Sequence, residues 1–362
     1  MRVKINNINI SCLFFLSLFS CALGIAPYVI IKFNNINAYI SILLGIILGT
    51  IPFFILLYLF NYEIDKPIYE KTKLVFGKIL GSIINIFLLI SYLIIAITIL
   101  FNISNFIISQ YLTNTPIILV IIIFCLTSLY ASNKGITTIV KISFIYTIIV
   151  ITLFILGIIG LIPEIEISNL KPILAYGIKK PLFGSFIYTL ILMVPANGIL
   201  LIPKNNIESN NKTNKYLIIT YIITTIMISL ISFVTCSVLG KNLLEIYQYP
   251  TYITLKRISI FGFIDRIENF LSFQWFLSAF ILLSLNINAI NSYINKGKSI
   301  IFKLFSTLII ILSTIILFKN NTNFNHYLDS YYPYILLTTE IIYFIIFLII
   351  IIKNVYKKKK CI

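Results

Sequence analysis

Residues 10–31 read ISCLFFLSLFSCALGIAPYVII, an apolar run long enough to cross a membrane as a helix, with Gly24 and Pro27 interrupting it near its end. The rest of the chain has the same character. Hydrophobic residues make up 59% of the 362 residues, charged residues make up 11%, and the mean hydropathy is +1.03. Soluble domains carry about 25% charged residues. The composition therefore excludes a soluble protein and predicts a chain whose solvent is lipid.

Apolar runs of this length recur along the sequence. A spanning helix needs about 20 mostly apolar residues to cross about 30 Å of hydrocarbon. Ten stretches meet this requirement, and no linker between them is long enough to separate two domains. The sequence predicts an all-α integral membrane protein, one membrane-embedded domain over 1–362, with ten transmembrane helices at 10–31, 37–60, 79–103, 115–131, 139–162, 182–202, 216–239, 267–290, 300–318 and 333–352.

The basic residues indicate the orientation of these spans. An even number of spans puts both termini on one side, and 19 of the 28 Lys and Arg residues fall on that side. The positive-inside rule therefore predicts that both termini are cytoplasmic. The basic residues that give the chain its net charge of +17 lie between the apolar runs. We therefore expect membrane lipid and no nucleic acid as a partner. Five scattered cysteines and a single histidine predict no metal site and no cofactor.

Helix breakers interrupt two of the spans. Span 1 is broken at Gly24-Ile25-Ala-Pro27, and span 6 is broken at Pro195-Ala-Asn197-Gly198. These are the first spans of the two halves, a pattern typical of transporters built on inverted repeats with a ligand site at the breaks. The alternative is that proline and glycine simply kink membrane helices. We expect Pro27 in the first turn of a half-helix and Asn197 as a half-helix cap, which together would suit a small carboxylate.

Polar side chains within the spans are the other candidates for a ligand site. Thr98 and Asn102 belong to a stripe along span 3, and such residues also act as hydrogen-bonding links between membrane helices. Glu340 lies about 10 Å into span 10, either as a functional carboxylate or as a protonated group. The predicted ligand-binding residues are Gly24, Ile25, Pro27, Thr98, Asn102, Pro195, Asn197, Gly198 and Ser278, with Arg266, Glu268 and Glu340 as further candidates.

Several short motifs resemble one known family. They are Gly24-Ile-Ala-Pro27, Leu170-Lys-Pro172-Ile-Leu, Tyr249-Pro250, and Phe263-Ile-Asp265-Arg266-Ile-Glu268 leading into Trp275. With the ten-span layout they resemble the spore germination permeases, the membrane-embedded B subunits of nutrient germinant receptors. The resemblance covers nearly the whole chain. It implies a transporter-like fold of the amino acid, polyamine and organocation superfamily, with a five-plus-five inverted repeat and broken helices 1 and 6.

The same resemblance implies a function. It predicts a non-enzymatic subunit in the inner spore membrane that senses a nutrient, most simply an amino acid, beside A and C partner subunits. The rival hypothesis is a secondary active amino acid transporter. Proton-coupled carriers usually need intramembrane acidic residues, and Glu340 alone gives weak support for pumping. An enzyme is not expected, because no Ser/His/Asp or metal-ligand constellation is present.

Overall fold

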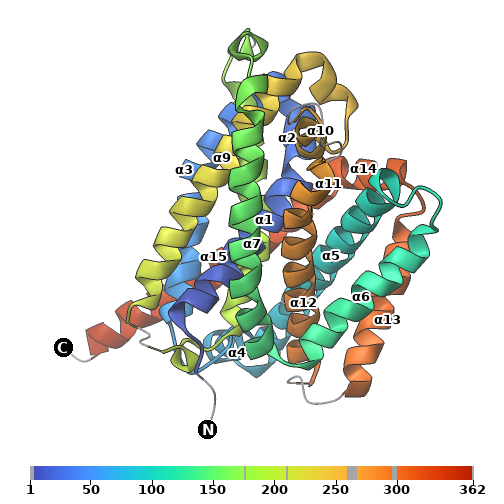
Figure 1. The fold of residues 1–362 in the computed structure, drawn as a ribbon. Coiled ribbons are helices and arrows are strands. Elements are labelled where there is room, and N and C mark those ends of the chain that lie inside the picture. The colour runs from blue at the N-terminus through green and yellow to red at the C-terminus, as the bar shows by residue number, and fades with distance from the viewer. Residues whose placement is uncertain (1–3, 175–176, 209–210, 259–266, 296–299, 361–362) are drawn as a thin grey trace.

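A computed structural model of the chain describes all residues except 1–3, 175–176, 209–210, 259–266, 296–299 and 361–362. The described residues form a bundle of α-helices joined by short loops and 3₁₀ turns (Figure 1). The helices are α1 (Asn7–Gly24), α2 (Ala26–Asn34), α3 (Ala38–Asn61), α4 (Ile68–Phe76), α5 (Lys78–Gln110), α6 (Ile117–Asn133), α7 (Ile136–Leu161), α8 (Lys179–Ala196), α9 (Thr213–Ile246), α10 (Pro250–Leu255), α11 (Ile267–Leu271), α12 (Phe273–Asn295), α13 (Ile300–Leu317), α14 (Asn321–Ser330) and α15 (Tyr332–Lys360).

The all-helical membrane fold predicted from the sequence is confirmed. Each predicted span falls on a helix, and within the described residues nine helical stretches are long and apolar enough to cross a membrane. The fourth predicted span corresponds to α6, which has only 17 residues. The grouping of the helices into a five-plus-five repeat stays a prediction.

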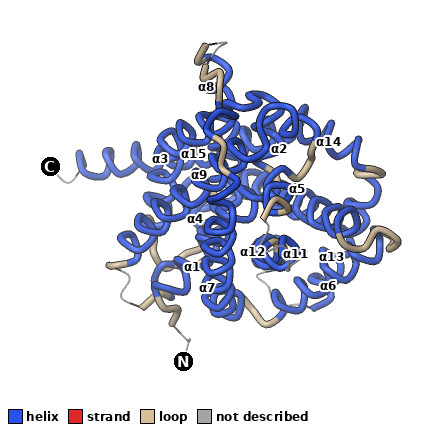
Figure 2. The backbone as a smooth tube through the Cα atoms, turned by 45° about the horizontal axis from the view of Figure 1, so that its top comes forward, coloured by secondary structure: helices blue, strands red, loops and turns tan. Residues whose placement is uncertain are grey.

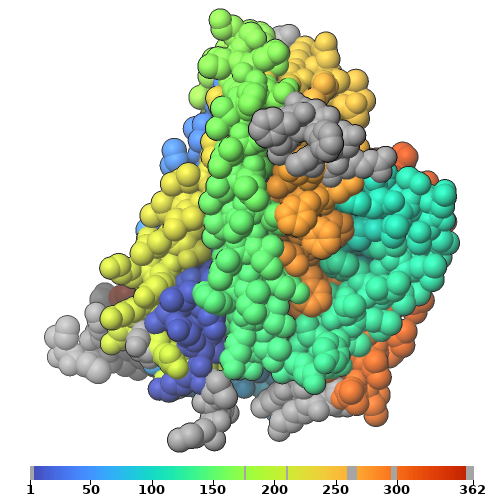
Figure 3. All heavy atoms as spheres, viewed as in Figure 1, coloured from blue at the N-terminus to red at the C-terminus, as the bar shows by residue number. Residues whose placement is uncertain are grey.

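Burial separates central helices from peripheral ones. The apolar windows of α1 and α8 are 89% and 94% buried inside the protein, whereas those of α13 and α15 are only 28% buried. α12 packs against α1, α5, α6, α7 and α13, so it also lies inside the bundle (Figure 2). α7 forms much of the outer face that is turned toward the viewer in Figure 3. Helices that are apolar all round are expected both in a protein core and against lipid.

The two central helices α1 and α8 run in opposite directions. Ile5, just before α1, pairs with the strand-like segment at Ile207 that follows α8, while Asn34 at the end of α2 packs against Gly184 near the start of α8. Each helix has 18 residues before its break, or about 27 Å at 1.5 Å per residue. We call the end of the bundle that carries both chain termini and α4 the proximal end, and the opposite end the distal end (Figure 1). The break after α1 therefore lies toward the distal end and the break after α8 toward the proximal end.

Candidate functional site

The distal break separates α1 from α2. α1 ends at Gly24, Ile25 leaves the regular helix with φ −113° and ψ −48°, and α2 begins at Ala26 with Pro27 in its first turn. Proline suits this place because the first residues of a helix have no intrahelical use for their N–H groups. The predicted position of this break is confirmed. The Leu23 carbonyl beside it accepts a hydrogen bond of 3.4 Å from the Thr251 hydroxyl of α10.

The indole of Trp275, the single tryptophan, fills the distal break. A Cβ atom at Gly24 would lie 2.2–2.3 Å from three indole atoms, closer than real contacts allow, and Trp275 is 7% exposed. Gly24 is therefore needed to admit a side chain of α12. The sequence predicts that ligand approaches the backbone here, and in this structure the indole occupies that place.

An aromatic cluster surrounds the Trp275 ring. The ring of Phe106 lies 4.4 Å from that of Trp275 and 5.0 Å from those of Tyr249 and Tyr252. The cavity left beside them is about 20 Å³, which is room for about one water molecule. The buried Oε1 atom of Gln274, which lines this cavity, has no hydrogen-bond partner among the described residues. Motifs far apart in the sequence, Gly24–Pro27, Tyr249-Pro250 and Trp275, thus meet in one closed site.

The polar stripe of α5 reaches this site. Asn105 donates through Nδ2 to the Tyr249 hydroxyl at 2.7 Å, and the same hydroxyl lies 3.5 Å from the carbonyl oxygen of Asn102. The Oδ1 atom of Asn102 is buried and has no partner among the described residues. Thr98 instead contacts the Tyr327 hydroxyl at 3.0 Å. Thr98 therefore links helices, whereas Asn102 keeps an acceptor free.

The proximal break is a different structure. α8 passes at Asn197 into a 3₁₀ helix, Asn197–Leu201, after Pro195, and no second α-helical half follows directly. The predicted capping role of Asn197 is wrong, because its side chain makes no cap and instead donates to the Glu340 carboxylate at 3.2 Å. A Cβ at Gly198 would lie 2.7 Å from Leu285, so α12 fills this break too.

The Asn197–Glu340 pair belongs to a polar cluster between α5, the 3₁₀ helix and α15. The Tyr92 hydroxyl lies 3.1 Å from the Tyr343 hydroxyl and 3.5 Å from the Asn197 carbonyl oxygen. Ser91, next to Tyr92, shares a hydrogen bond of 2.7 Å with Thr339, which lies next to Glu340 and one helical turn before Tyr343. Sequence reasoning missed Tyr92 and Tyr343. Tyr92 lies one residue after Ser91, and Tyr343 lies three residues after Glu340. This proximity to polar residues is the only sequence signal that could have identified them.

The two breaks do not form one site at one depth. Trp275 faces the distal break and Leu285 faces the proximal one, and these residues are ten positions apart on α12. That spacing corresponds to about 15 Å along the helix. The structure therefore joins Asn197 to Glu340 and places Gly24, Ile25 and Pro27 with the aromatic cluster.

The remaining candidates lie elsewhere. Ser278 is buried and donates to the Trp275 carbonyl oxygen at 3.0 Å within α12. Arg266 lies outside the described residues, so the predicted pair with Glu268 has no described geometry. Among the residues that the structure describes, no group of three His, Cys, Asp or Glu side chains could hold a metal ion.

Comparison with known proteins identifies the family. The family model described as spore germination protein matches residues 4–325. The chain belongs to the spore germination permease family. Relatives include spore germination protein KB of Bacillus subtilis (strain 168), 25% identical over 70% of this chain and 68% of the relative, and the putative spore germination protein YfkT of the same organism, 28% identical over 73% of this chain and 72% of the relative.

A solved structure shows the same fold. The nucleobase-cation-symport-1 family transporter Mhp1, in a closed conformation with bromovinylhydantoin bound, superposes with a TM-score of 0.64 and 14% identity over 90% of this chain and 75% of that one. This permease is thus a multi-pass membrane subunit of a germinant receptor, built on a transporter fold.

Proposed function

We propose that this permease senses a small nutrient, an amino acid, by binding it at the distal break, and that it catalyses no reaction. In this proposal the protein lies in the inner spore membrane with both termini in the cytoplasm and works with A and C subunits. Membership of the family supports the sensing role, and the side chains at the distal break support an amino acid as the ligand.

One observation carries the amino acid proposal: the described side chains that line the small cavity at the distal break include polar groups but no charged one. None of the described residues that line its small cavity is ionisable as an acid or a base near neutral pH. The unpartnered oxygens of Asn102 and Gln274 can accept from an ammonium group, and the N-terminus of α2 favours a carboxylate. A site without net charge fits a zwitterion, whose own charge sums to zero.

Sensing follows from the occupied break. A nutrient can enter only if the Trp275 indole leaves the space beside Gly24. The ligand therefore favours an arrangement in which α12 has shifted relative to α1, and a partner subunit that contacts α12 or its neighbours can read that shift. A ligand moves such an equilibrium only by binding the two arrangements with different affinity.

The test uses spores that lack the gene and are complemented with variants. Their germination is measured against amino acids, nucleosides and sugars. We expect the wild-type gene to restore the response to one amino acid and Trp275→Phe to shift its half-maximal concentration. Phe273→Leu, an exposed position two residues away, serves as the control and should not. A response restored only to a nucleoside or a sugar would overturn the ligand class.

The transporter alternative rests on Glu340, an intramembrane carboxylate held by Asn197. It predicts that protein reconstituted alone in vesicles accumulates its nutrient under a proton gradient and that Glu340→Gln abolishes this uptake. Binding without accumulation is the outcome that the sensing proposal expects.

The orientation has its own test. Cys12, Cys21, Cys125 and Cys236 are buried, so a membrane-impermeant thiol reagent has Cys361 as its target. Labelling of inside-out vesicles and not of right-side-out ones is expected. The reverse pattern would place the termini outside.

A further inference from the structure

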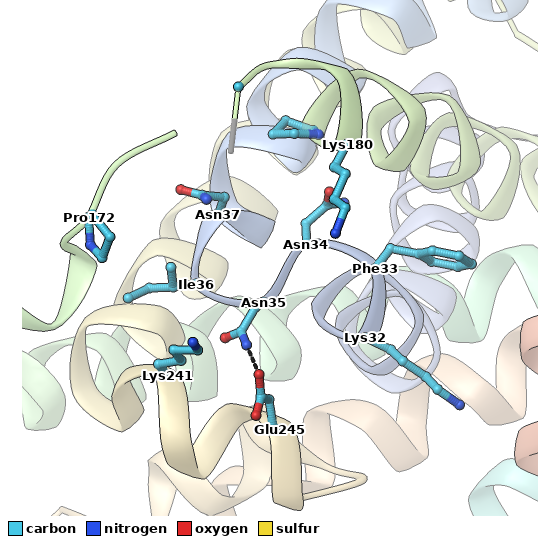
Figure 4. A pocket seen from close by; sticks show the side chains of 12 residues that line it. Lys32, Phe33, Asn34, Asn35, Ile36, Asn37, Pro172, Lys180, Lys241 and Glu245 are labelled. Atoms are coloured by element: carbon cyan, nitrogen blue, oxygen red, sulfur yellow. Dashed lines mark hydrogen bonds between the residues drawn. The ribbon is translucent and has the colours of Figure 1, made fainter. Parts of the chain in front are cut away.

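A second, larger cavity opens at the distal end. Its volume is about 300 Å³, and it lies where the turn between α2 and α3 meets the start of α8 and the last turn of α9 (Figure 4). None of its lining residues belongs to either break. Its chemistry is therefore independent of the site beside Trp275.

One wall of this cavity carries buried amide groups without partners. Asn34 is 6% exposed, and neither its Oδ1 nor its Nδ2 atom has a hydrogen-bond partner among the described residues. Asn35, held at φ +50°, donates through Nδ2 to Glu245 but leaves its own Oδ1 without a partner. Buried polar atoms in folded proteins are nearly always hydrogen-bonded. Three unpartnered atoms on adjacent residues therefore indicate a place for a polar ligand.

The other walls carry charge of both signs. Lys180 comes from the first turn of α8, while Lys241 and Glu245 come from one face of α9, just after its kink at Gly240 (φ +62°). Figure 4 shows Lys180 and Lys241 on opposite sides of the asparagine turn and Glu245 below it. No ion pair of Lys180 or Lys241 occurs within the described part of the chain.

Lys32 also lines the cavity, but its ammonium pairs with Asp329 on another element. The cations left for a ligand are thus Lys180 and Lys241.

We propose that this distal cavity is a second ligand site, for an α-amino acid. Lys180 and Lys241 bind the carboxylate, and Glu245 with Oδ1 of Asn35 accepts from the ammonium. A lining that carries both cationic groups and a carboxylate can pair the two charges of a zwitterion separately, whereas a simple cation or a neutral sugar leaves at least the lysines without a partner. The site goes beyond the sensing role of the distal break, because its occupant neither contacts nor displaces Trp275.

The experiment measures binding to the full chain in lipid nanodiscs. The probe is each of the twenty radiolabelled amino acids in equilibrium dialysis, with Trp275 fluorescence followed in parallel. We expect wild-type protein to bind at least one amino acid without a change in Trp275 emission. Lys180→Gln and Lys241→Gln should each weaken that binding about tenfold, as expected for losing one charge-assisted contact. Lys179→Gln, the neighbouring lysine that does not line the cavity, should change it less than about twofold.

Competition tests the zwitterion itself. The amine and the keto acid that correspond to the bound amino acid, each lacking one of its charges, should compete at least about tenfold more weakly than the unlabelled amino acid. The proposal is overturned if Lys180→Gln and Lys241→Gln behave like Lys179→Gln, if the keto acid competes equally well, or if every binding event changes Trp275 emission. If every binding event changes Trp275 emission, the proposal for the distal break still stands. If only the binding event that changes Trp275 emission is absent, the proposal for the second site still stands.

Discussion

The two ends of the bundle differ in the side chains that fill the helix break and in the exposure of their lysines. At the distal break an aromatic side chain fills the gap, and the lysines of the separate distal cavity, Lys180 and Lys241, are exposed. At the proximal break a carboxamide bonds a carboxylate, and Lys71 is buried at 1% exposure. An aromatic ring therefore closes the distal break, whereas a hydrogen bond between side chains closes the proximal one. Two breaks at matching places in the sequence therefore have different chemistry.

The largest expected effect is at the distal break. Gly24→Leu places a side chain where the Trp275 indole lies, and overpacking of this kind costs about 1–3 kcal/mol or more. We expect little folded protein in spore membranes and no nutrient response, measured by immunoblot and germination rate. Adding Trp275→Ala supplies the missing space, so the double variant should accumulate again. Normal germination of Gly24→Leu spores would show that the indole is not fixed against the break.

The buried lysine of the proximal end gives the next largest effect. The Lys71 ammonium donates to the carbonyl oxygens of Leu59 at 2.8 Å and Phe60 at 3.4 Å, where α3 ends. Burial, assisted by the nearby Lys204 charge, lowers the pKa of Lys71 from 10.5 to about 7, although Glu63 opposes the shift. Between about pH 7 and pH 10 the unfolded chain then holds a proton that the folded chain has released, so stability rises with pH, by up to a few kcal/mol.

Thermal unfolding in detergent at pH 7 and pH 9.5 measures this rise. Lys71→Met should flatten it, because the titrating group is gone. Lys73→Met, an exposed lysine two residues along, should leave it unchanged. An equal slope in Lys71→Met and wild type would assign the pH dependence to another group.

A smaller effect is expected from the hydrogen bond of the proximal break. Asn197→Ala removes the donor to Glu340 and leaves a buried acceptor unpaired, at a cost of about 1–3 kcal/mol. Its nutrient sensitivity should fall roughly five- to tenfold, in keeping with a loss of about 1 kcal/mol or slightly more. If Asn197 acts through Glu340, Asn197→Ala should reduce nutrient sensitivity less in a Glu340→Gln background than in the wild type. Additive losses of sensitivity would show that the two residues act independently.

The sequence predicted where the chain breaks but not what fills each break. Gly24 and Pro27 are local signals, since they act on their own backbone, and the structure confirms the break they predict. The partner of Asn197 is 143 residues away, and no local pattern can specify it. The depth of the breaks also escaped prediction. The breaks lie toward opposite ends because each follows an 18-residue helix and these two helices, α1 and α8, run in opposite directions.

The distal lysines and asparagines show the same limit. Asn34, Asn35, Lys180 and Glu245 occur in a chain rich in asparagine and lysine, and nothing in their spacing sets them apart. Only the packing of α2, α8 and α9 brings them around one cavity. A site made by tertiary contacts among common residues has no sequence signature.

The smallest expected effect comes from the ion pair at the distal end. Lys32 on α2 pairs with Asp329 on α14, and their side chains are 54% and 16% exposed. Water and salt screen such a pair, so its coupling energy should be below about 1 kcal/mol in a double-mutant cycle with Lys32→Gln and Asp329→Asn, and smaller still at high salt.

Yet the pair ties α2, the half-helix beyond the distal break, to α14. If α2 must move for Trp275 to leave, losing the pair favours the ligand-binding arrangement, and the double variant should respond at a nutrient concentration up to about fivefold lower. Lys66, paired with Glu63 at the proximal end, offers the matched control, since Lys66→Gln removes a similarly exposed pair far from the distal break. Sensitivity that falls in the distal variant, or rises equally in both, would mean that α2 does not move during the response.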